Sequence, residues 1–337
     1  MKGMKRIRKK DIEKFIGELK RRYEVIAPVE ENGKVFFKIL GENDDITLNY
    51  TNSCIPPKEF FIPEREQLFR FREINDNIAI YSNLSDICER ERIIFGIRPC
   101  DVNALLILDN VAKDCFEDTY YFKRRDNTIL IAIECTEPSD ECFCSTFNTG
   151  PSLDKGADLI LTDIGDSYLV NAKTKKGNKI LNFKFFEDAD EKDEKIADRR
   201  IRDAKNVEIK NIGGQIKPEI LKHFSRRCLS CYSCTYICPT CYCFDVVDKF
   251  NIFDNSGERI RCWDSCMSPS FSRMAGNVNP RDDKHKRFIN RINHKLIYMY
   301  ERYKVFGCVG CGRCTINCPS GISMFAIIKY AQKQKRE

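Results

Sequence analysis

Two cysteine runs of identical spacing constrain this chain more than any other feature of its sequence. In each run, two residues separate the first cysteine from the second and the second from the third, three residues separate the third from the fourth, and a proline follows directly. The runs occupy residues 228–238 and 308–318, and the prolines are Pro239 and Pro319. Three thiolates spaced in this way let one loop surround three corners of an iron–sulfur cube, and backbone N–H groups of that loop can donate to the sulfurs. We therefore expect a fold that contains two such loops.

The spacing is that of bacterial ferredoxins, in which the fourth cysteine of each run binds the cluster of the other run. This crossed pattern predicts two [4Fe–4S] clusters. The ligands expected for the first are Cys228, Cys231, Cys234 and Cys318, and those expected for the second are Cys308, Cys311, Cys314 and Cys238. Structural zinc is the alternative, but it favours closed sites built from pairs of C-x2-C. Two identical runs that both end in proline favour clusters over zinc.

The total of 19 cysteines in 337 residues indicates either disulfides or metal ligands. The basic start of the chain is not followed by an apolar segment, so we expect no secretory signal, a cytoplasmic location and reduced thiols. No apolar run approaches the ~20 residues that span a bilayer, so no membrane association is expected. The net charge of +7 comes from 57 basic and 50 acidic residues that are mixed along the chain, which does not favour a nucleic-acid partner.

The pattern of apolar residues predicts an α+β protein of two domains. Residues 92–97 and 128–133 read as buried strands with a helix between them, a βαβ pattern that indicates parallel strands in one sheet. A strongly charged segment and Gly213-Gly214 then indicate a boundary. We expect an N-terminal α/β domain over residues 1–212 and a mainly α-helical dicluster ferredoxin domain over residues 213–337, with a long helix over 282–303.

A further cysteine group follows the two predicted strands. Cys100 and Cys135 each come shortly after a strand, and Cys142 and Cys144 lie in the next loop. Parallel strands end at the same rim of a sheet, where α/β proteins usually bind ligands. We therefore predict a third metal site, another [4Fe–4S] cluster, from these four cysteines. The alternative is that they pack as small buried hydrophobic residues.

Other candidate residues carry weaker signals. Cys241, Cys243, Cys262 and Cys266 either bind metal or pack around the ferredoxin core, and packing is the favoured interpretation. Arg98 and Asp101 either line a site or act structurally, with Arg98 paired to a carboxylate and Asp101 capping the next helix. The sequence contains no Gly-rich nucleotide fingerprint and no Walker motif. These observations favour an electron relay without a substrate pocket of its own.

Several segments make the chain resemble the beta subunits of sulfhydrogenases, which are soluble NiFe hydrogenases, and the related iron–sulfur subunit of anaerobic sulfite reductase. The segments that carry the resemblance extend over nearly the whole chain. They include Arg98-Pro99-Cys100-Asp101, Cys135-Thr136-Glu137-Pro138, Cys142-Phe143-Cys144, Thr149-Gly150-Pro151, Cys238-Pro239-Thr240-Cys241-Tyr242-Cys243 and Trp263-Asp264-Ser265-Cys266. Asn277 departs from the family pattern, in which another glycine is expected after Gly276.

The resemblance implies that this chain is an iron–sulfur subunit of an anaerobic complex. In that complex it would relay electrons between a catalytic subunit and a flavin-containing, NAD(P)H-reactive subunit. The catalytic partner is a NiFe hydrogenase in one branch and a sirohaem sulfite reductase in the other, and the first branch is favoured. It also implies that Cys241, Cys243 and Cys266 belong to the family pattern. Two alternatives stay open: a stand-alone iron–sulfur enzyme of thiol or sulfur chemistry, and a zinc-binding scaffold. The terminal acceptor and the direction of electron flow do not follow from the sequence.

Overall fold

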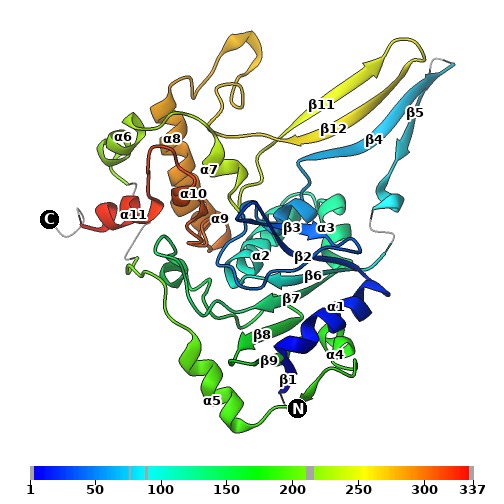
Figure 1. Ribbon diagram of the computed structural model, residues 1–337. Helices are drawn as coiled ribbons and strands as arrows, with labels where there is room; N and C mark the ends of the chain where they lie inside the picture. The colour runs from blue at the N-terminus through cyan, green and yellow to red at the C-terminus, as the bar shows by residue number, and fades with distance from the viewer. Residues whose placement is uncertain (1–3, 76, 88–89, 210–215, 334–337) are drawn as a thin grey trace.

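The larger of two β-sheets organises the first half of the chain (Figure 1). The computed structural model describes residues 4–75, 77–87, 90–209 and 216–333. The sheet has eight strands in the order β10-β1-β9-β8-β7-β6-β2-β3. Its strands are β1 (Lys5–Arg8), β2 (Glu24–Glu31), β3 (Lys34–Ile39), β6 (Arg92–Ile97), β7 (Thr128–Ile133), β8 (Leu159–Asp163), β9 (Ser167–Ala172) and β10 (Glu187–Asp188).

The four central strands, β2, β6, β7 and β8, are parallel, which is the arrangement predicted for residues 92–97 and 128–133. All six residues of β7 are buried, because helices cover both faces of the parallel centre. The apolar side chains of α1 and α4 pack on one face and those of α2 and α3 on the other. The helices of this half are α1 (Ile12–Lys20), α2 (Pro99–Lys113), α3 (Thr119–Asp126), α4 (Lys175–Ile180) and α5 (Glu191–Arg200).

The second half of the chain contributes a group of helices beside the large sheet (Figure 1). Buried residues of α6, α8 and α11 form its core, including Leu221, Ile292 and Ile328. The helix expected over 282–303 starts at Lys284 and contains a π-helical turn, His294–Tyr298. The helices are α6 (Pro218–Arg226), α7 (Ser233–Tyr236), α8 (Lys284–Asn293), α9 (Met299–Tyr303), α10 (Arg313–Ile316) and α11 (Met324–Lys333).

A second, four-stranded antiparallel sheet extends away from the rest of the molecule, and we call it the blade (Figure 1). Its order is β11-β12-β4-β5, with strands β4 (Arg65–Ile74), β5 (Asn77–Ser82), β11 (Phe244–Asn251) and β12 (Ser256–Trp263). The sequence predicted a mainly α-helical domain over residues 213–337, yet β11 and β12 form a complete antiparallel hairpin within it. Because β12 pairs with β4, the blade joins the two halves of the chain in one sheet.

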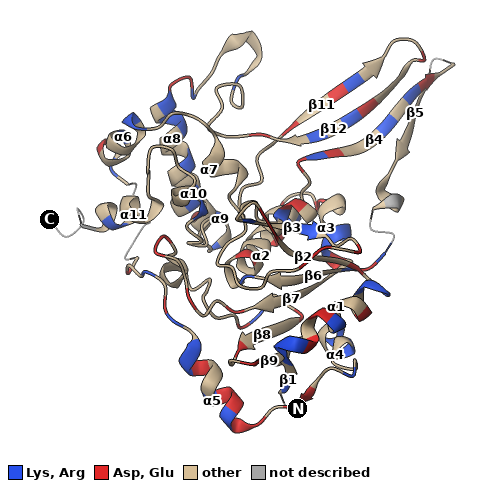
Figure 2. Ribbon diagram, in the orientation of Figure 1, with Lys and Arg blue, Asp and Glu red and all other residues tan. Residues whose placement is uncertain are grey.

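Charged side chains of both signs are spread along α5 and the blade, as Figure 2 shows. The expected domain boundary after residue 212 falls within 210–215 and lies outside the described residues. Among the helices that the structure describes, none is both long and apolar enough to cross a membrane.

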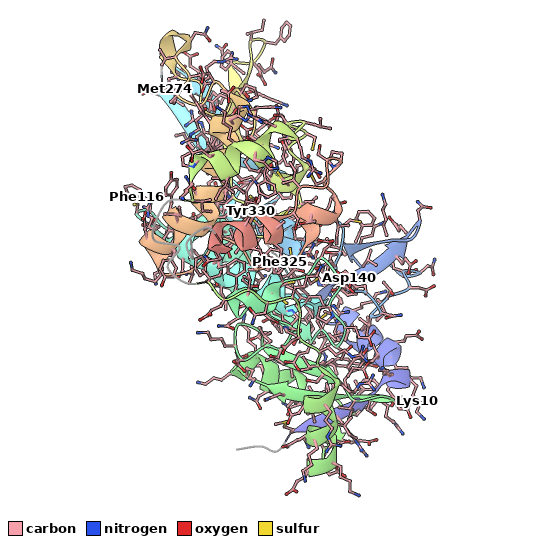
Figure 3. All side chains as sticks on the ribbon, turned by 90° about the vertical axis from the view of Figure 1, so that its left-hand side faces the viewer. Lys10, Phe116, Asp140, Met274, Phe325 and Tyr330 are labelled. Atoms are coloured by element: carbon pink, nitrogen blue, oxygen red, sulfur yellow. The ribbon has the colours of Figure 1, made fainter. Side chains whose placement is uncertain are left out.

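The two halves meet at the loop that follows β7. The Phe143 ring of this loop packs against Phe325 of α11 with the ring centroids 5.6 Å apart, and Phe147 packs against Phe306 at 5.2 Å. In Figure 3, Phe325 and Asp140 lie where the helical part meets the part built on the large sheet. The loop that carries Cys142 and Cys144 therefore lies at the junction of the two halves.

Candidate iron–sulfur centres

The two cysteine runs fold into the same backbone shape. Ser230 and Tyr232 have positive φ angles of 54° and 64°, and Gly310 and Gly312, at the equivalent positions, have 63° and 75°. Each loop leads into a one-turn helix, α7 in the first run and α10 in the second. The two one-turn helices lie against each other. The sequence repeat is therefore also a structural repeat, and its two copies face one another.

Glycine is required in the second loop because that loop lies directly against the backbone of the residues around Phe143. A Cβ on Gly310 would lie 2.5 Å from the carbonyl carbon of Phe143, and one on Gly312 would lie 2.6 Å from the carbonyl oxygen of Glu141. Phe143 N–H donates to the Gly310 carbonyl at 2.7 Å. The second run is thus held against the loop that carries Cys142 and Cys144.

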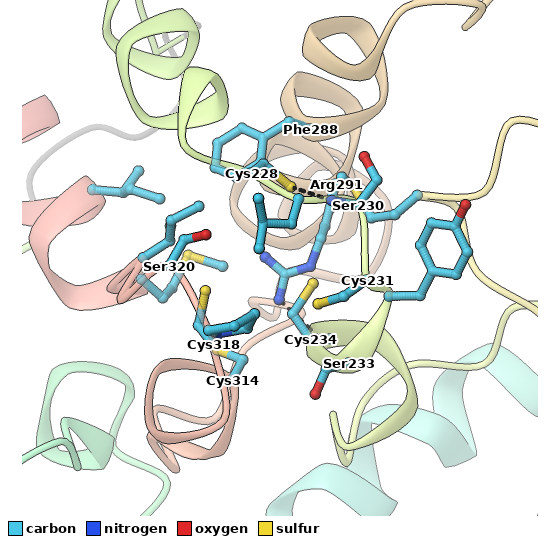
Figure 4. Close-up of a pocket in the computed structure, with 17 residues that line it drawn as sticks. Cys228, Ser230, Cys231, Ser233, Cys234, Phe288, Arg291, Cys314, Cys318 and Ser320 are labelled. Carbon is cyan, nitrogen blue, oxygen red and sulfur yellow. Dashed lines mark hydrogen bonds between the residues drawn. The ribbon is translucent and has the colours of Figure 1, made fainter.

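The cysteines predicted for the first cluster line one cavity (Figure 4). They are Cys228, Cys231, Cys234 and Cys318, and Cys314 also lines the cavity. Apolar side chains such as Phe288 and Ile327 form part of its wall. Ser230 N–H donates to the sulfur of Cys228 at 3.4 Å, the kind of contact that stabilises negative charge on a cluster ligand. The fourth cysteine of the second run is therefore placed beside the first three of the first run.

A buried arginine lies in the same cavity. Arg291 of α8 is 6% exposed, and one of its terminal nitrogens donates to the carbonyl of Cys234 at 3.1 Å. Its Nε has no hydrogen-bond partner among the described residues. Burial disfavours the charged guanidinium, but the thiols of Cys234 and Cys314 beside it, as thiolates, raise its pKa above the ordinary value. A buried cation beside several thiols, with its Nε left without an acceptor, fits a cavity that holds an anionic group.

The second set of cysteines is more deeply buried. Cys238 lies close enough to Cys308 and Cys311 for their charges to interact, and Cys314 interacts with both as well. Burial raises the pKa of the Cys311 thiol to about 12. Lys295, which is 3% exposed, donates to the hydroxyl of Thr240 at 2.8 Å and to the Gly307 carbonyl at 2.9 Å. Burial disfavours its charge, but the neighbouring thiolates of Cys238 and Cys241 raise the pKa of Lys295.

The four cysteines predicted for a third site also come together. The amide of Asn52 bridges two of them, because its nitrogen donates to the sulfur of Cys142 at 3.6 Å while its oxygen lies 3.9 Å from the sulfur of Cys100. Cys144 interacts electrostatically with Cys142 and Cys135. The same Asn52 nitrogen donates to the carbonyl of Cys311 at 2.7 Å. This third group therefore borders the second ferredoxin loop.

No three His, Cys, Asp or Glu side chains in the described part of the chain are close enough to hold a single metal ion. The thiolates around an iron–sulfur cube bind separate iron atoms, so they need not converge as the ligands of one ion do.

The structural alternative given for Arg98 and Asp101, in which Arg98 pairs with a carboxylate and Asp101 caps the next helix, is wrong. Arg98 donates to the carbonyl oxygens of Leu48, Tyr50, Ile133 and Glu134 and not to a carboxylate. Helix α2 has no side-chain cap. The Asp101 carboxylate instead accepts two hydrogen bonds from Arg313 of α10, both at 2.7 Å. This ion pair ties the second cysteine run to the start of α2.

Sequence reasoning missed the buried cations around the cysteines. Arg287, Arg291 and Lys295 are all buried and recur every four residues, so they share one face of the helical segment from 284 to 298. The apolar residues Phe288 and Ile292 lie next to them in the sequence and are also buried. A basic stripe beside an apolar stripe, between two cysteine runs, was the signal that could have indicated buried positive charge.

Comparison with known proteins agrees with this geometry. Residues 227–322 match the family described as "4Fe-4S dicluster domain". The chain is 30% identical over 325 residues to "Sulfhydrogenase 2 subunit beta" of Pyrococcus furiosus, an alignment that covers 93% of this chain and 94% of that protein. The chain belongs to the sulfhydrogenase beta subunit family. No solved structure shows a significant match.

Membership of the sulfhydrogenase beta subunit family confirms the resemblance found in the sequence, and the dicluster match indicates [4Fe–4S] clusters in the second half of the chain. Together these findings support an iron–sulfur electron-transfer subunit. The α+β architecture, with its C-terminal dicluster domain, is also as predicted.

Proposed function

We propose that this chain relays electrons through two [4Fe–4S] clusters with crossed ligands. Cys228, Cys231, Cys234 and Cys318 would hold the first cluster, and Cys308, Cys311, Cys314 and Cys238 the second. The observation that carries the proposal is the position of Cys318, which lies in the cavity of the first run although it belongs to the second. When bound, such clusters accept and release single electrons.

The surroundings of the cysteines suit this role. The apolar wall that includes Phe288 and Ile327 keeps water from the sulfurs, and the cations Arg291 and Lys295 offset negative charge on them. Crossed ligation keeps the two centres close together, because each run then contributes to both of them. The α7 and α10 turns, which lie against each other, support this closeness.

We further propose that Cys100, Cys135, Cys142 and Cys144 hold a third [4Fe–4S] cluster. This group shares Asn52 with Cys311, so it would continue the path from the second cluster to the carboxyl rim of the large sheet. The four cysteines belong to the N-terminal α/β domain proposed for residues 1–212, and the other eight to the ferredoxin domain proposed for residues 213–337.

The relative from Pyrococcus furiosus is named as the beta subunit of a sulfhydrogenase, which favours a multi-subunit complex for this chain too. We propose that its partners, in the cytoplasm, are a NiFe hydrogenase-type catalytic subunit together with a flavin-containing, NAD(P)H-reactive subunit. The alternative partner is a sirohaem sulfite reductase-type subunit, which the sequence resemblance to the iron–sulfur subunit of anaerobic sulfite reductase supports. A stand-alone enzyme of thiol chemistry is the remaining alternative.

Iron and acid-labile sulfide per chain, together with EPR of the reduced protein, test the proposal on anaerobically purified material. We expect about eight iron atoms from the two ferredoxin clusters and about twelve with the third. The C318S variant should lose most of the first cluster's signal. The matched control C54S replaces a cysteine outside all these groups and should keep the signal.

Electron relay is tested separately from iron content. The isolated, iron-loaded chain should oxidise NAD(P)H at a negligible rate and gain activity only when a flavoprotein partner is added. Rapid NAD(P)H oxidation by the isolated chain would contradict a relay role and favour the stand-alone enzyme.

A further inference from the structure

Three cysteines outside the groups above gather next to the second ferredoxin set. Cys241 and Cys243 follow Cys238 closely in the chain, and Cys266 follows β12. The thiol of Cys241 is hydrogen-bonded to that of Cys238, and the thiol of Cys243 to that of Cys266. The Lys295 ammonium interacts electrostatically with Cys241, Cys243 and Cys266. All three thiols therefore surround one small region.

The backbone that carries these cysteines is held from several sides. Cys241 N–H donates to the carbonyl of Cys238 at 3.2 Å, and Asp264 N–H donates to the carbonyl of Cys243 at 3.0 Å. Ser265 is fully buried, and its hydroxyl accepts a hydrogen bond from Thr235 at 2.9 Å. The thiols are thus brought together by two fixed segments of the second half, the one after Cys238 and the one after β12.

Two buried lysines border the same region. Lys58 lies in the 3-10 helix Pro57–Phe60 and, like Lys295, is only 3% exposed. Its ammonium donates to the carbonyl of Cys241 at 2.8 Å and lies 4.4 Å from the centre of the Trp263 ring. Within the described residues, neither lysine has a carboxylate partner. The groups around Lys58 that can carry negative charge are the thiols of Cys241, Cys238 and Cys243.

This combination needs negative charge that neutral, packing cysteines do not supply. A buried ammonium without a counter-ion is strongly unfavourable, and neutral thiols give it little compensation. Cys238 is assigned to the second ferredoxin cluster, whose thiolates can offset Lys295. Lys58 approaches from the other half of the chain and donates to the carbonyl of Cys241. Burial lowers the pKa of Lys58, and thiolates at Cys241, Cys238 and Cys243 oppose this effect. Two of these three cysteines, Cys241 and Cys243, lie outside the ferredoxin sets.

We propose that Cys241, Cys243 and Cys266 are thiolate ligands of a further iron–sulfur centre, with Lys58 and Lys295 as its buried counter-charges. Three thiolates occupy three corners of a cube, and the fourth corner takes a ligand other than cysteine. No described interaction links Cys262 to these thiols, although it is close to them in the sequence. The centre lies at the base of the blade, where the indole Nε1–H of Trp263 donates to the carbonyl of Ile62 at 2.9 Å. It goes beyond the three clusters proposed above and does not depend on the third of them.

The test compares iron and sulfide content in variants of the full-length chain purified anaerobically. C241S/C243S should contain about four fewer iron atoms per chain than the unaltered protein. The matched control C262S replaces the neighbouring cysteine and should keep the full content. Unchanged iron in C241S/C243S would overturn the proposal and reduce these cysteines to packing residues.

Two further variants keep the result interpretable. C266S serves if the double variant does not fold, because it leaves the segment after Cys238 intact, and it should also lower the iron content. An iron content of C266S equal to that of the unaltered protein would overturn the proposal. C142S/C144S separates this centre from the third cluster. Loss of iron in C142S/C144S but not in C241S/C243S would leave the proposed relay in place and reject the additional centre.

Discussion

The ion pair between Arg313 and Asp101 gives the sharpest test of how the two halves are joined. Both side chains are 1% exposed, and the guanidinium also donates to the carbonyl of Ser53 at 2.8 Å and to its hydroxyl at 3.1 Å. Replacing Arg313 by Met leaves the Asp101 carboxylate buried without a partner. Removal of one member of a buried ion pair typically costs about 3–5 kcal/mol, so R313M should lower the free energy of unfolding by that amount.

Urea unfolding of anaerobic protein, followed by circular dichroism on samples of equal iron content, measures this change. With a dependence of roughly 3 kcal/mol per molar urea, which is suited to a chain of this size, the midpoint should fall by about 1 M or more. The matched control is R259Q, which breaks the exposed pair between Arg259 and Asp248 at 2.6 Å. An exposed pair contributes about 0–1 kcal/mol, so its midpoint should move much less.

The double variant D101L/R313M removes both charges at once. It should be at least about 2 kcal/mol more stable than the sum of the single effects predicts, because no charge is left unpaired. The reasoning is refuted if R313M shifts the midpoint no further than R259Q, or if the two single effects simply add.

Three further predictions concern separate features. G310A should destabilise the protein by about 2 kcal/mol or more, since its Cβ would meet the Phe143 backbone at 2.5 Å. The control G276A has a similar φ and nothing within 4 Å of its Cβ, so it should cost only about 1 kcal/mol. Equal melting temperatures of the two variants would contradict this prediction. R291M should make the reduction potential of the first cluster more negative by roughly 40 mV, which is equivalent to about 1 kcal/mol of lost charge stabilisation. A redox titration followed by EPR measures this shift. The control R287M should leave the potential unchanged, because the Arg287 guanidinium donates to the carbonyls of Met267, Arg281 and Asp282. Burial and the Glu64 charge raise the pKa of Glu59 to about 7 from its ordinary value of 4.5, so the folded state keeps a proton that the unfolded chain loses. The free energy of unfolding should therefore fall by about 1–3 kcal/mol as the pH rises from 4.5 to 7. Urea titrations of E59Q should lack this fall.

The features that the sequence predicted well are local. The spacing of each cysteine run determines one loop, and the apolar runs at 92–97 and 128–133 are long enough to be recognised as buried parallel strands. The convergence of Cys100 with Cys142 was also accessible, because parallel strands end at a shared rim.

The features that the sequence did not show depend on distant partners. All eight residues of β11 are exposed, so its apolar residues do not alternate with polar ones in the way that reveals a half-buried strand. Asp101 reads as a helix-cap residue because its actual partner, Arg313, is more than two hundred positions away. The buried charge of Lys58 has the same origin, since the cysteines around it belong to the other half of the chain.

The pairing of β4 with β12 also determines when the blade can form during synthesis. Arg72 pairs with Ser256 and Arg65 with Cys262, so β4 leaves the ribosome long before its partner exists. At about 5–20 residues per second, the delay is on the order of ten to forty seconds. During that time the edge of β4 that later pairs with β12 is open, a state prone to association with other chains. We therefore expect newly made chains to need a chaperone at this hairpin, and chains truncated before residue 256 to aggregate.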